Sequence, residues 1–491
     1  MFPYVIPRVT TIVMKTSDAA SVVTVNDHIA EPQPRRELGL RDLVLFYVVV
    51  TLSLRWLPLA AAAGPSTIVI WLLGVAVVFI PLALCVMELS SRYPEEGGMY
   101  VWSKHAFGDG AGFLTGWIYW TSNLPYFPVL LYFAASNALY VGGERWHGLQ
   151  SSASFFMAFS VIGLALALVV NIVGLRIGKW LNNLGAIGTW IPVALLFCLA
   201  LMAWWKLGPV SNLQPQSFKP SLTVANFGVW ATLLSAFAGA EAASFMGSEI
   251  KRPRRDIPRA LLIAGFFVVA GYVLGTLAIL VVVPREQLNS LEGLMLAISS
   301  SGARVGWHGL GPAVALLITI STLGTVGAYL AAVARIPFVG GIDRYLPSVF
   351  ARVHPRWGTP YIALLAQGLC SVVFVIMSQA GSSIRGAYQV LISTTVIATF
   401  LPYLFMFAAL IRLQSRPAGP GVVRIPGGKP GATAVAIVGF TATLLVVAGS
   451  VIPDANDPHK ALAVAKVVLL SVALVFGGAV LYRLGKRRAS A

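Results

Sequence analysis

Apolar runs about as long as a membrane is thick recur along this chain, and they restrict its fold more than any other feature. A chain in lipid must satisfy its own backbone hydrogen bonds, so each run is expected to be a helix. The twelve runs are 43–63, 67–89, 112–141, 155–173, 184–205, 226–246, 261–283, 310–334, 361–377, 388–411, 433–452 and 463–481. We therefore predict an all-α integral membrane protein with twelve transmembrane helices.

The composition excludes several other classes of protein. Of the 491 residues, 57% are hydrophobic and 11% are charged, which does not suit a set of soluble domains. The net charge of +17 would favour nucleic acid only if the basic residues formed a soluble patch, and here they fall in short loops. The three cysteines and six histidines show no ligand-like clustering. No nucleic-acid partner, metal site or cofactor is expected, and no phosphate-binding loop indicates direct use of ATP.

Lysine and arginine lie unevenly across the loops. With the N-terminus inside, the inner loops carry twenty-four of them and the outer loops and helix ends eight. Inner loops of membrane proteins are enriched in these residues, so both termini are predicted to be cytoplasmic. The first 40 residues lack the pattern of a signal peptide and are expected to form a cytoplasmic tail.

Three inner loops carry long motifs. They read "ELSSRYPEEGGMYVWSKHAFGDGAGFLTGWIYW" (88–120), "GSEIKRPRRDIPRAL" (247–261) and "ARIPFVGGIDRYLPSVFARVHPRWGTPYIAL" (334–364). They resemble the signature loops of the amino acid, polyamine and organocation (APC) permease superfamily, in its amino acid permease branch. The resemblance runs from about Leu38 to Leu413.

This resemblance implies a LeuT-like fold, a 5+5 inverted repeat in which helices 1 and 6 are broken at mid-membrane and bind substrate. The implied organisation is a cytoplasmic tail (1–40), a ten-helix transport core (41–413), two accessory transmembrane helices (414–482) and a basic cytoplasmic C-terminus (483–491).

The sixth run, "LLSAFAGAEAASFMGSE", is suited to a broken helix. Its small residues permit an unwound stretch, and Glu241 is a carboxylate deep in an apolar run. The family pattern is matched by Ala236, Phe237, Ala238, Gly239 and Glu241, while Ala240 replaces the usual aromatic residue. The resemblance implies that Ala236, Phe237, Gly239 and Glu241 bind substrate.

The first run, "TLSLRWLPLAAAAGPS", departs from the family. Where relatives have a Gly-Ser-Gly turn that receives a carboxylate, this chain has Ser53, Leu54 and Arg55. Pro58 and the small residues after it favour a break nearby, displaced along the helix. A guanidinium matches a carboxylate with two hydrogen bonds, so Ser53 and Arg55 are candidate substrate ligands. The alternative is that Arg55 only pairs with Glu241 and holds the two broken helices together.

Further polar groups lie in other runs. Tyr119 and Asn123 in the third run are candidate substrate ligands. Ser321 and Thr322 in the eighth are candidates for a sodium site that the family fold offers, although such hydroxyls commonly bond back to their own helix. Glu241 is also a candidate proton carrier. The coupling ion, proton or sodium, is left open.

The expected function is secondary active transport, as symport or exchange, of amino acids or related small organic solutes across the plasma membrane by alternating access. The positive charge of Arg55 favours neutral or acidic amino acids over polyamines. Alternatives are a polyamine or amine permease of the same fold, and a sensor that binds without transporting. A membrane enzyme is not expected, since its only catalytic pattern would be His105 and Asp109 in "HAFGD". Membrane lipid is an expected partner, and the oligomeric state is left open.

Overall fold

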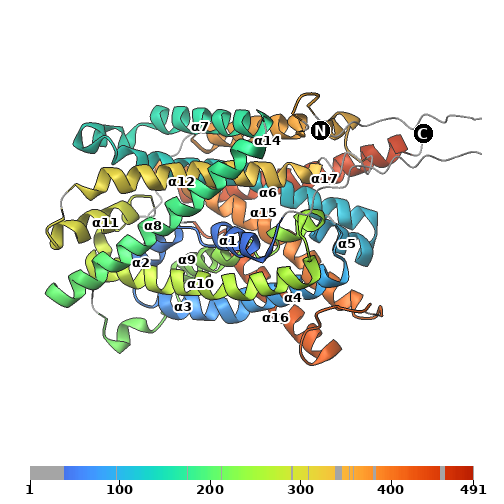
Figure 1. Cartoon of the computed structure of the whole chain (residues 1–491), viewed down its shortest axis with the longest axis horizontal. Coiled ribbons are helices and arrows are strands. Elements are labelled where there is room, and N and C mark those ends of the chain that lie inside the picture. The colour runs from blue at the N-terminus through green and yellow to red at the C-terminus, as the bar shows by residue number, and fades with distance from the viewer. Residues whose placement is uncertain are drawn as a thin grey trace, which may run out of the picture.

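The structure, a computed structural model, describes residues 38–489 except 96, 174, 212, 289–290, 308, 338–344, 353, 358, 380–382, 418 and 454–458. Its helices run side by side, most of them along the long axis of the molecule (Figure 1). The α-helices are α1 (Leu40–Thr51), α2 (Trp56–Ala63), α3 (Thr67–Gly74), α4 (Ile80–Arg92), α5 (Met99–Phe107), α6 (Asp109–Leu139), α7 (Ala153–Val173), α8 (Leu175–Leu207), α9 (Val224–Leu234), α10 (Pro253–Val282), α11 (Gly293–Arg304), α12 (Leu310–Val333), α14 (Tyr361–Gln379), α15 (Ile384–Leu413), α16 (Gly428–Gly449) and α17 (Lys460–Ala489). A π-helical turn, η1 (Val75–Phe79), joins α3 to α4, and the 3-10 segments are η2 (Gly143–Ser151), η3 (Pro215–Phe218), η4 (Ser235–Phe237), η5 (Ala242–Glu249), η6 (Arg285–Gln287) and η7 (Ser348–Ala351).

The protein is an all-α membrane protein. Nine of the described helical segments are long and apolar enough to cross a membrane, and α1 with α2 makes a tenth if this bent pair is one span. The two other predicted runs correspond to α6 and to the interrupted segment from α9 to η5. With 31 residues, α6 is roughly 46 Å long, and almost all its side chains after residue 112 are buried. It is enclosed by other helices, which explains its more polar composition.

The first predicted span is broken. Helix α1 ends at Thr51 and α2 begins at Trp56, and the two are bent by 47°. The break therefore lies at Ser53 to Arg55 and not further along, in the alanine run. Pro58 occupies the third position of α2, where the backbone N–H would have no partner within the helix in any case. The proline ring therefore fits in α2 without breaking this helix a second time.

The sixth predicted span is broken as well. After α9 the chain makes the single 3-10 turn η4, becomes extended at Ala238 and adopts a φ of 113° at Gly239. A Cβ atom on Gly239 would lie 2.9 Å from Val50 Cγ1, closer than carbon atoms pack. Glycine is thus required here for two reasons, its positive φ and the contact between the two breaks.

Tyr272, on α10, joins the two breaks. Its hydroxyl donates to the Thr51 carbonyl, accepts from the Ser53 N–H at 3.2 Å and lies 3.2 Å from the Ala236 carbonyl oxygen. Its ring stacks on Trp71 of α3, with the ring centroids 4.5 Å apart. One hydroxyl thus lies against backbone groups of both broken helices, with its single proton given to one carbonyl and its oxygen accepting from one N–H.

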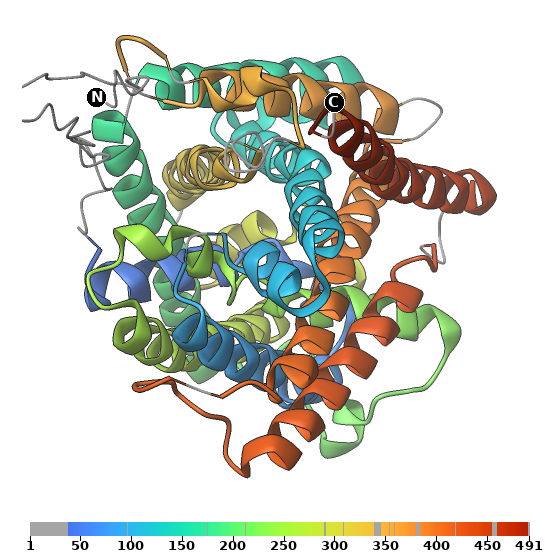
Figure 2. The same ribbon diagram turned by 90° about the vertical axis from the view of Figure 1, so that its right-hand side faces the viewer.

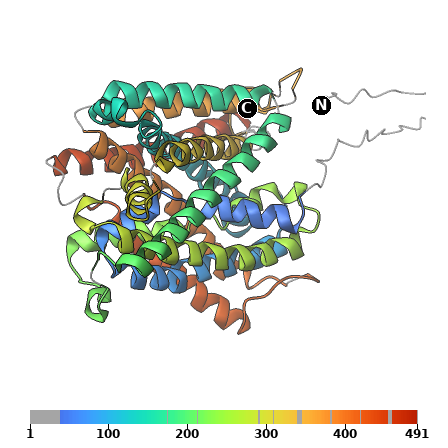
Figure 3. The same cartoon turned by 60° about the vertical axis from the view of Figure 1, so that its left-hand side comes forward.

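Helix α6 packs against α12 and α15 at the centre, and α16 and α17 lie at the outside of the bundle (Figure 2). Helix α8 crosses the bundle obliquely against α10 and α12 (Figure 3). Residues 483–489, predicted as a basic C-terminal end, continue α17 as helix. Of the predicted cytoplasmic tail, residues 1–37 lie outside the described part of the chain.

A buried ion pair at the end of α4 also holds the segment between α15 and α16. Glu88 contacts Arg92 at 2.8 Å, and both side chains are almost fully buried. The Glu88 carboxylate also accepts hydrogen bonds from Gln414 and, at 3.0 Å, from the Ile425 N–H. The segment between α15 and α16 is thereby held against the end of α4.

Candidate functional site

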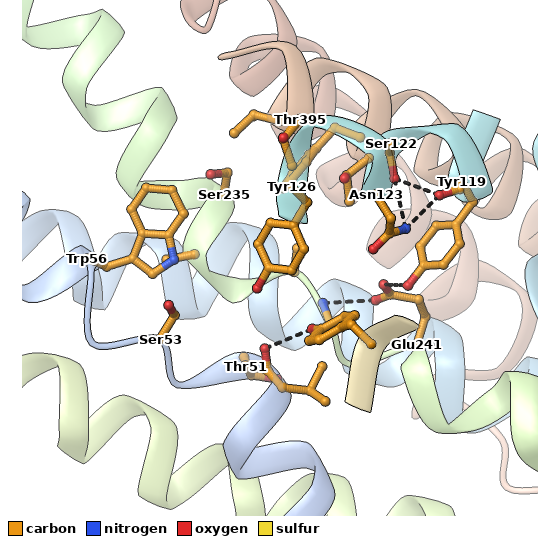
Figure 4. A pocket seen from close by; sticks show the side chains of 18 of the residues that line it. Thr51, Ser53, Trp56, Tyr119, Ser122, Asn123, Tyr126, Ser235, Glu241 and Thr395 are labelled. Carbon is orange, nitrogen blue, oxygen red and sulfur yellow. Dashed lines mark hydrogen bonds between the residues drawn. The ribbon is translucent and has the colours of Figure 1, made fainter. Parts of the chain in front are cut away.

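A cavity lies where the two breaks meet α6, α12 and α15 (Figure 4). The space between these elements, counted together with its opening, is about 580 Å³. It is lined by Val50, Thr51, Ser53, Arg55, Trp56, Tyr119, Ser122, Asn123, Tyr126, Ser235, Ala236, Ala238, Gly239, Glu241, Tyr329, Thr395, Val396, Thr399 and Phe400. Residues far apart in the sequence thus form one chamber between the halves of the broken helices.

The structure brings most of the candidate substrate ligands into this cavity. Those that line it are Ser53, Arg55, Tyr119, Asn123, Ala236, Gly239 and Glu241. Phe237 does not line it, although the family pattern places it there. Its ring lies against Trp71 at 5.6 Å and Tyr272 at 5.7 Å, so it packs into the core behind the break.

Glu241 forms one end of the cavity and is held by neutral donors. Its carboxylate accepts a hydrogen bond of 2.9 Å from the Tyr119 hydroxyl and one of 3.1 Å from the Gly239 N–H. The Tyr403 hydroxyl on α15 also interacts with it. The side chain is almost fully buried. No cationic side chain within the described ranges forms an ion pair with this carboxylate, so it is suited to meet a cationic group or a proton.

Arg55 lies in the break of the first span and is 6% exposed. Its guanidinium carbon is 4.0 Å from the centroid of the Trp56 ring and 5.3 Å from that of Tyr126. Tyr388 on α15 interacts with it as well. Among the residues that the structure describes, Nε and Nη1 find no hydrogen-bond partner. No ion pair joins Arg55 to Glu241, so the pairing considered from the sequence is not the arrangement seen here.

The two charges occupy different ends of the cavity. Helix α6 places Tyr119 beside Glu241 and Tyr126 beside Arg55. Seven residues separate these tyrosines, which corresponds to roughly 10 Å along the helix. Figure 4 shows Tyr119 against Glu241, with Tyr126 and Trp56 displaced toward the other side of the chamber. The cavity is therefore dipolar.

The other polar groups of the lining differ in how well they are satisfied. Ser122 and Asn123 donate to the Tyr119 carbonyl at 2.7 and 2.8 Å, within their own helix. The buried Thr395 hydroxyl, in contrast, has no partner in the described part of the chain. Its hydroxyl, like two nitrogens of Arg55, is available to a ligand.

The two candidates for a sodium site lie away from the cavity. The Ser321 hydroxyl is 2.9 Å from that of Thr189 on α8, and the Thr322 hydroxyl donates to the Ile318 carbonyl at 2.8 Å. Thr322 thus bonds back to its own helix, as such residues often do. The described residues contain no group of three or more His, Cys, Asp or Glu side chains that could hold a metal ion. A role for Ser321 and Thr322 in coupling stays a prediction.

Tyr272 is the main structural residue that the sequence did not indicate. It lies in the seventh apolar run, and no pattern sets it apart from tyrosines elsewhere in the chain. Its function depends on two carbonyls and one N–H that become free only when helices 1 and 6 break. The role of Tyr272 could be predicted from the sequence only if the positions of both breaks were already known.

Comparison with known proteins agrees with this architecture. The model of a family described as "Amino acid permease" matches residues 39–475. An uncharacterized transporter of Legionella pneumophila is 30% identical over 464 residues, covering 91% of this chain and 95% of the relative. The serine/threonine exchanger SteT of Bacillus subtilis is 24% identical over 353 residues, covering 71% and 75%.

A solved structure shows the same fold. It is that of MhsT in complex with L-phenylalanine, with a TM-score of 0.59 at 15% sequence identity. The match covers 83% of this chain and 98% of that one. The broken first and sixth spans thus occur in a chain whose overall fold is that of MhsT.

Proposed function

Because the chain belongs to the amino acid permease family, whose members are transporters and not enzymes, we propose that it moves amino acids or related small organic solutes by alternating access. One observation carries the proposal: a cavity lies at the breaks of both interrupted spans. Discontinuous helices with a site between their halves are typical of secondary transporters.

The polar ends of the broken helices supply the binding groups. The N-terminus of α2 faces the break at Ser53 to Arg55, and the partial positive charge of a helix N-terminus favours an anionic group. The Glu241 carboxylate, at the other end, favours an ammonium group. Alternating access then requires that the chamber open to one side at a time.

The inner side of the chamber is closed by aromatic side chains. Tyr119 stacks on Phe245, with ring centroids 4.7 Å apart, and Tyr329 donates to the Val50 carbonyl at 3.1 Å. An apolar pocket of about 370 Å³ lies against the same Val50, Tyr119 and Tyr329, and it is also lined by residues of α1, η5 and α12. We infer that substrate leaves toward the cytoplasm through this pocket once the tyrosines separate.

The source of energy is an ion gradient or a counter-substrate. Glu241 faces the cavity and is the residue suited to exchange a proton with a substrate that binds beside it. The relative named as a serine/threonine exchanger supports exchange of one amino acid for another. Symport with a proton, symport with sodium and exchange are the three modes to be separated.

We place the protein in the plasma membrane with both termini in the cytoplasm. The support is the charge asymmetry, twenty-four lysines and arginines in inner loops against eight outside. Helix α17, the last of the chain, ends in the same direction as α5, which lies in a predicted inner loop (Figure 1).

Flux into proteoliposomes tests the proposal. Purified protein is reconstituted and supplied with radiolabelled L-serine, L-leucine, L-glutamate or putrescine, with or without unlabelled compound inside and with an imposed pH or sodium gradient. We expect uptake of at least one amino acid above empty liposomes. Binding without flux would indicate a sensor, chemical change of the probe would indicate an enzyme, and uptake of putrescine alone would indicate an amine permease.

A further inference from the structure

Two of the three motifs in the predicted inner loops meet at η5, the second half of the broken sixth span. Gly98, which precedes α5, lies against Ser244 and Phe245 of η5, and a Cβ atom on it would overlap Ser244 Oγ and lie 3.3 Å from a carbon of the Phe245 ring. Gly247 faces the other motif in the same way, since its Cβ atom would lie 2.5 Å from the Pro94 carbonyl oxygen. Each motif therefore supplies a glycine where the two segments approach most closely.

This contact lies directly behind the aromatic pair that closes the chamber. The ring of Phe245, next to Gly98, stacks on Tyr119 with the ring centroids 4.7 Å apart. The neighbouring Ser244 hydroxyl donates a hydrogen bond of 2.6 Å to the Glu241 carbonyl. A movement of η5 away from Gly98 would therefore carry with it both the closing ring and the backbone of the carboxylate residue in the cavity.

The other side of the contact is fixed to helices that are not broken. Helix α5 packs closely on α6, because a Cβ atom on Gly112 would lie 2.7 Å from Lys104 Cβ and 3.1 Å from the Tyr100 carbonyl oxygen. Trp102 of α5 is fully buried, and its Nε1 donates to the Tyr93 carbonyl at 3.5 Å. Helix α5 also packs against α15. The contact is thus a junction between the broken sixth span and a part of the molecule that stays with α6 and α15.

We propose that Gly98 and Pro94, packed against Ser244, Phe245 and Gly247, form a latch that keeps the chamber closed toward the cytoplasm. The proposal rests on the transport function given above and adds the contact that must part before substrate enters the apolar pocket between η5 and α12. Closely packed interfaces have discrete arrangements and do not deform continuously, so such a junction is either closed or parted. A methyl group added at the latch should hold it open without touching the substrate cavity, which neither glycine lines.

The test measures how fast a buried cysteine in that pocket reacts. Val333, on α12, is 4% exposed and lines the pocket together with Phe245. In a chain whose three natural cysteines are replaced by alanine, the rate at which N-ethylmaleimide modifies Val333→Cys is measured on the purified full chain, with and without Gly247→Ala. Gly148→Ala is the matched control, because nothing lies within 4 Å of its Cβ position. Ser371→Cys, fully buried on α14 and outside both cavities, reports general loosening of the fold.

We expect Gly247→Ala to raise the rate of modification of Val333→Cys about tenfold or more, since overpacking a close contact commonly costs enough to shift a two-state equilibrium by that factor. The rate at Ser371→Cys should stay the same in this variant. Gly148→Ala should leave both rates unchanged.

A second variant decides the question if Gly247→Ala does not fold. Ser244→Val keeps the backbone of η5 but places a methyl group against Gly98, so the rate at Val333→Cys should rise in the same direction by a smaller factor. The midpoint of thermal unfolding shows which variants are folded.

Three results would overturn the latch. One is an unchanged rate at Val333→Cys in both latch variants, and another is an equal rise at Ser371→Cys, which would show that the substitutions only loosen the fold. The third is loss of the folded protein in both variants, which would assign the contact to stability alone. The labelling needs no transported solute, so absence of flux for every probe would contradict the transport function separately, whatever the labelling rates.

Discussion

The Tyr119 hydroxyl donates a hydrogen bond of 2.9 Å to the Glu241 carboxylate, so the middle of α6 is tied to the break of the sixth span. Tyr119→Phe keeps the ring that stacks on Phe245 but removes this donor. A hydrogen bond to a charged group contributes about 1.5–3 kcal/mol, so the initial rate of uptake should fall about tenfold or more. Tyr132→Phe, which removes a hydroxyl of the same helix outside the cavity, should retain most of the uptake. Equal rates in the two variants would contradict a role for the Tyr119 bond.

Glu241 is the residue through which a proton gradient would act. Glu241→Gln keeps the shape and can still accept from Tyr119, but it no longer binds and releases a proton. If transport is proton-coupled, uptake driven by an imposed pH gradient should be lost while exchange of internal for external substrate survives. Uptake measured across external pH in both proteins decides this. An unchanged pH dependence in the variant would remove Glu241 from coupling.

Gly239→Ala should abolish transport. The added Cβ would lie 2.9 Å from Val50 Cγ1, and the φ of 113° is unfavourable for alanine. Gly108→Ala is the matched control, because Gly108 also has a positive φ, 92°, but nothing lies within 4 Å of its Cβ position. The control should lose only about 1–2 kcal/mol of stability and keep its uptake. Similar uptake by the two variants would show that the breaks do not need their close contact.

Glu88→Ala should destabilise the protein through its inner loop. Removing one partner of a buried ion pair costs about 3–5 kcal/mol, and here Arg92 would stay buried without its carboxylate. The segment between α15 and α16 should then detach, so trypsin should cleave faster after Arg424. Asp109→Asn, which removes an exposed partner of Lys104, should cost about 1 kcal/mol or less. A cleavage rate in Glu88→Ala no faster than in Asp109→Asn would contradict the attachment.

Single cysteines test the orientation of the chain. The three natural cysteines are first replaced by alanine. A cysteine at Ser221, an exposed position between α8 and α9, should then react with a membrane-impermeant maleimide in intact cells. One at Ser415, exposed between α15 and α16, should react only after permeabilisation. The reverse labelling pattern would invert the predicted topology.

The helical membrane fold could be predicted because hydropathy alone determines it. Each predicted run is found within a helix or an interrupted helix, since lipid permits no other backbone structure at that depth. The predicted helix boundaries are less accurate where a helix continues past its apolar run into a charged segment. Helix α8 begins at Leu175, nine residues before the predicted run, because a helix can extend beyond the hydrocarbon layer without any hydropathy signal.

The site could be predicted only in part. Small residues and a deep carboxylate indicated the sixth-span break, and the family pattern placed Gly239 and Glu241 there. The same pattern placed Phe237 in the cavity, but periodicity is lost once a helix unwinds, and the ring turns into the core. Tyr272 was missed for a related reason, because hydrogen bonds between distant segments leave no local signal.

The hydroxyl of Tyr272 ties both breaks to α10, whereas Asn123 and Thr395 contribute to the chamber from α6 and α15. The side chain that joins the two broken helices and several of the side chains that line the chamber thus lie on different helices. Descendants of this chain can exchange side chains on α6 and α15, and so acquire new solutes, without disturbing the joint that keeps the two breaks in register. In this architecture, a change of substrate range and the conservation of the broken-helix core can therefore evolve separately.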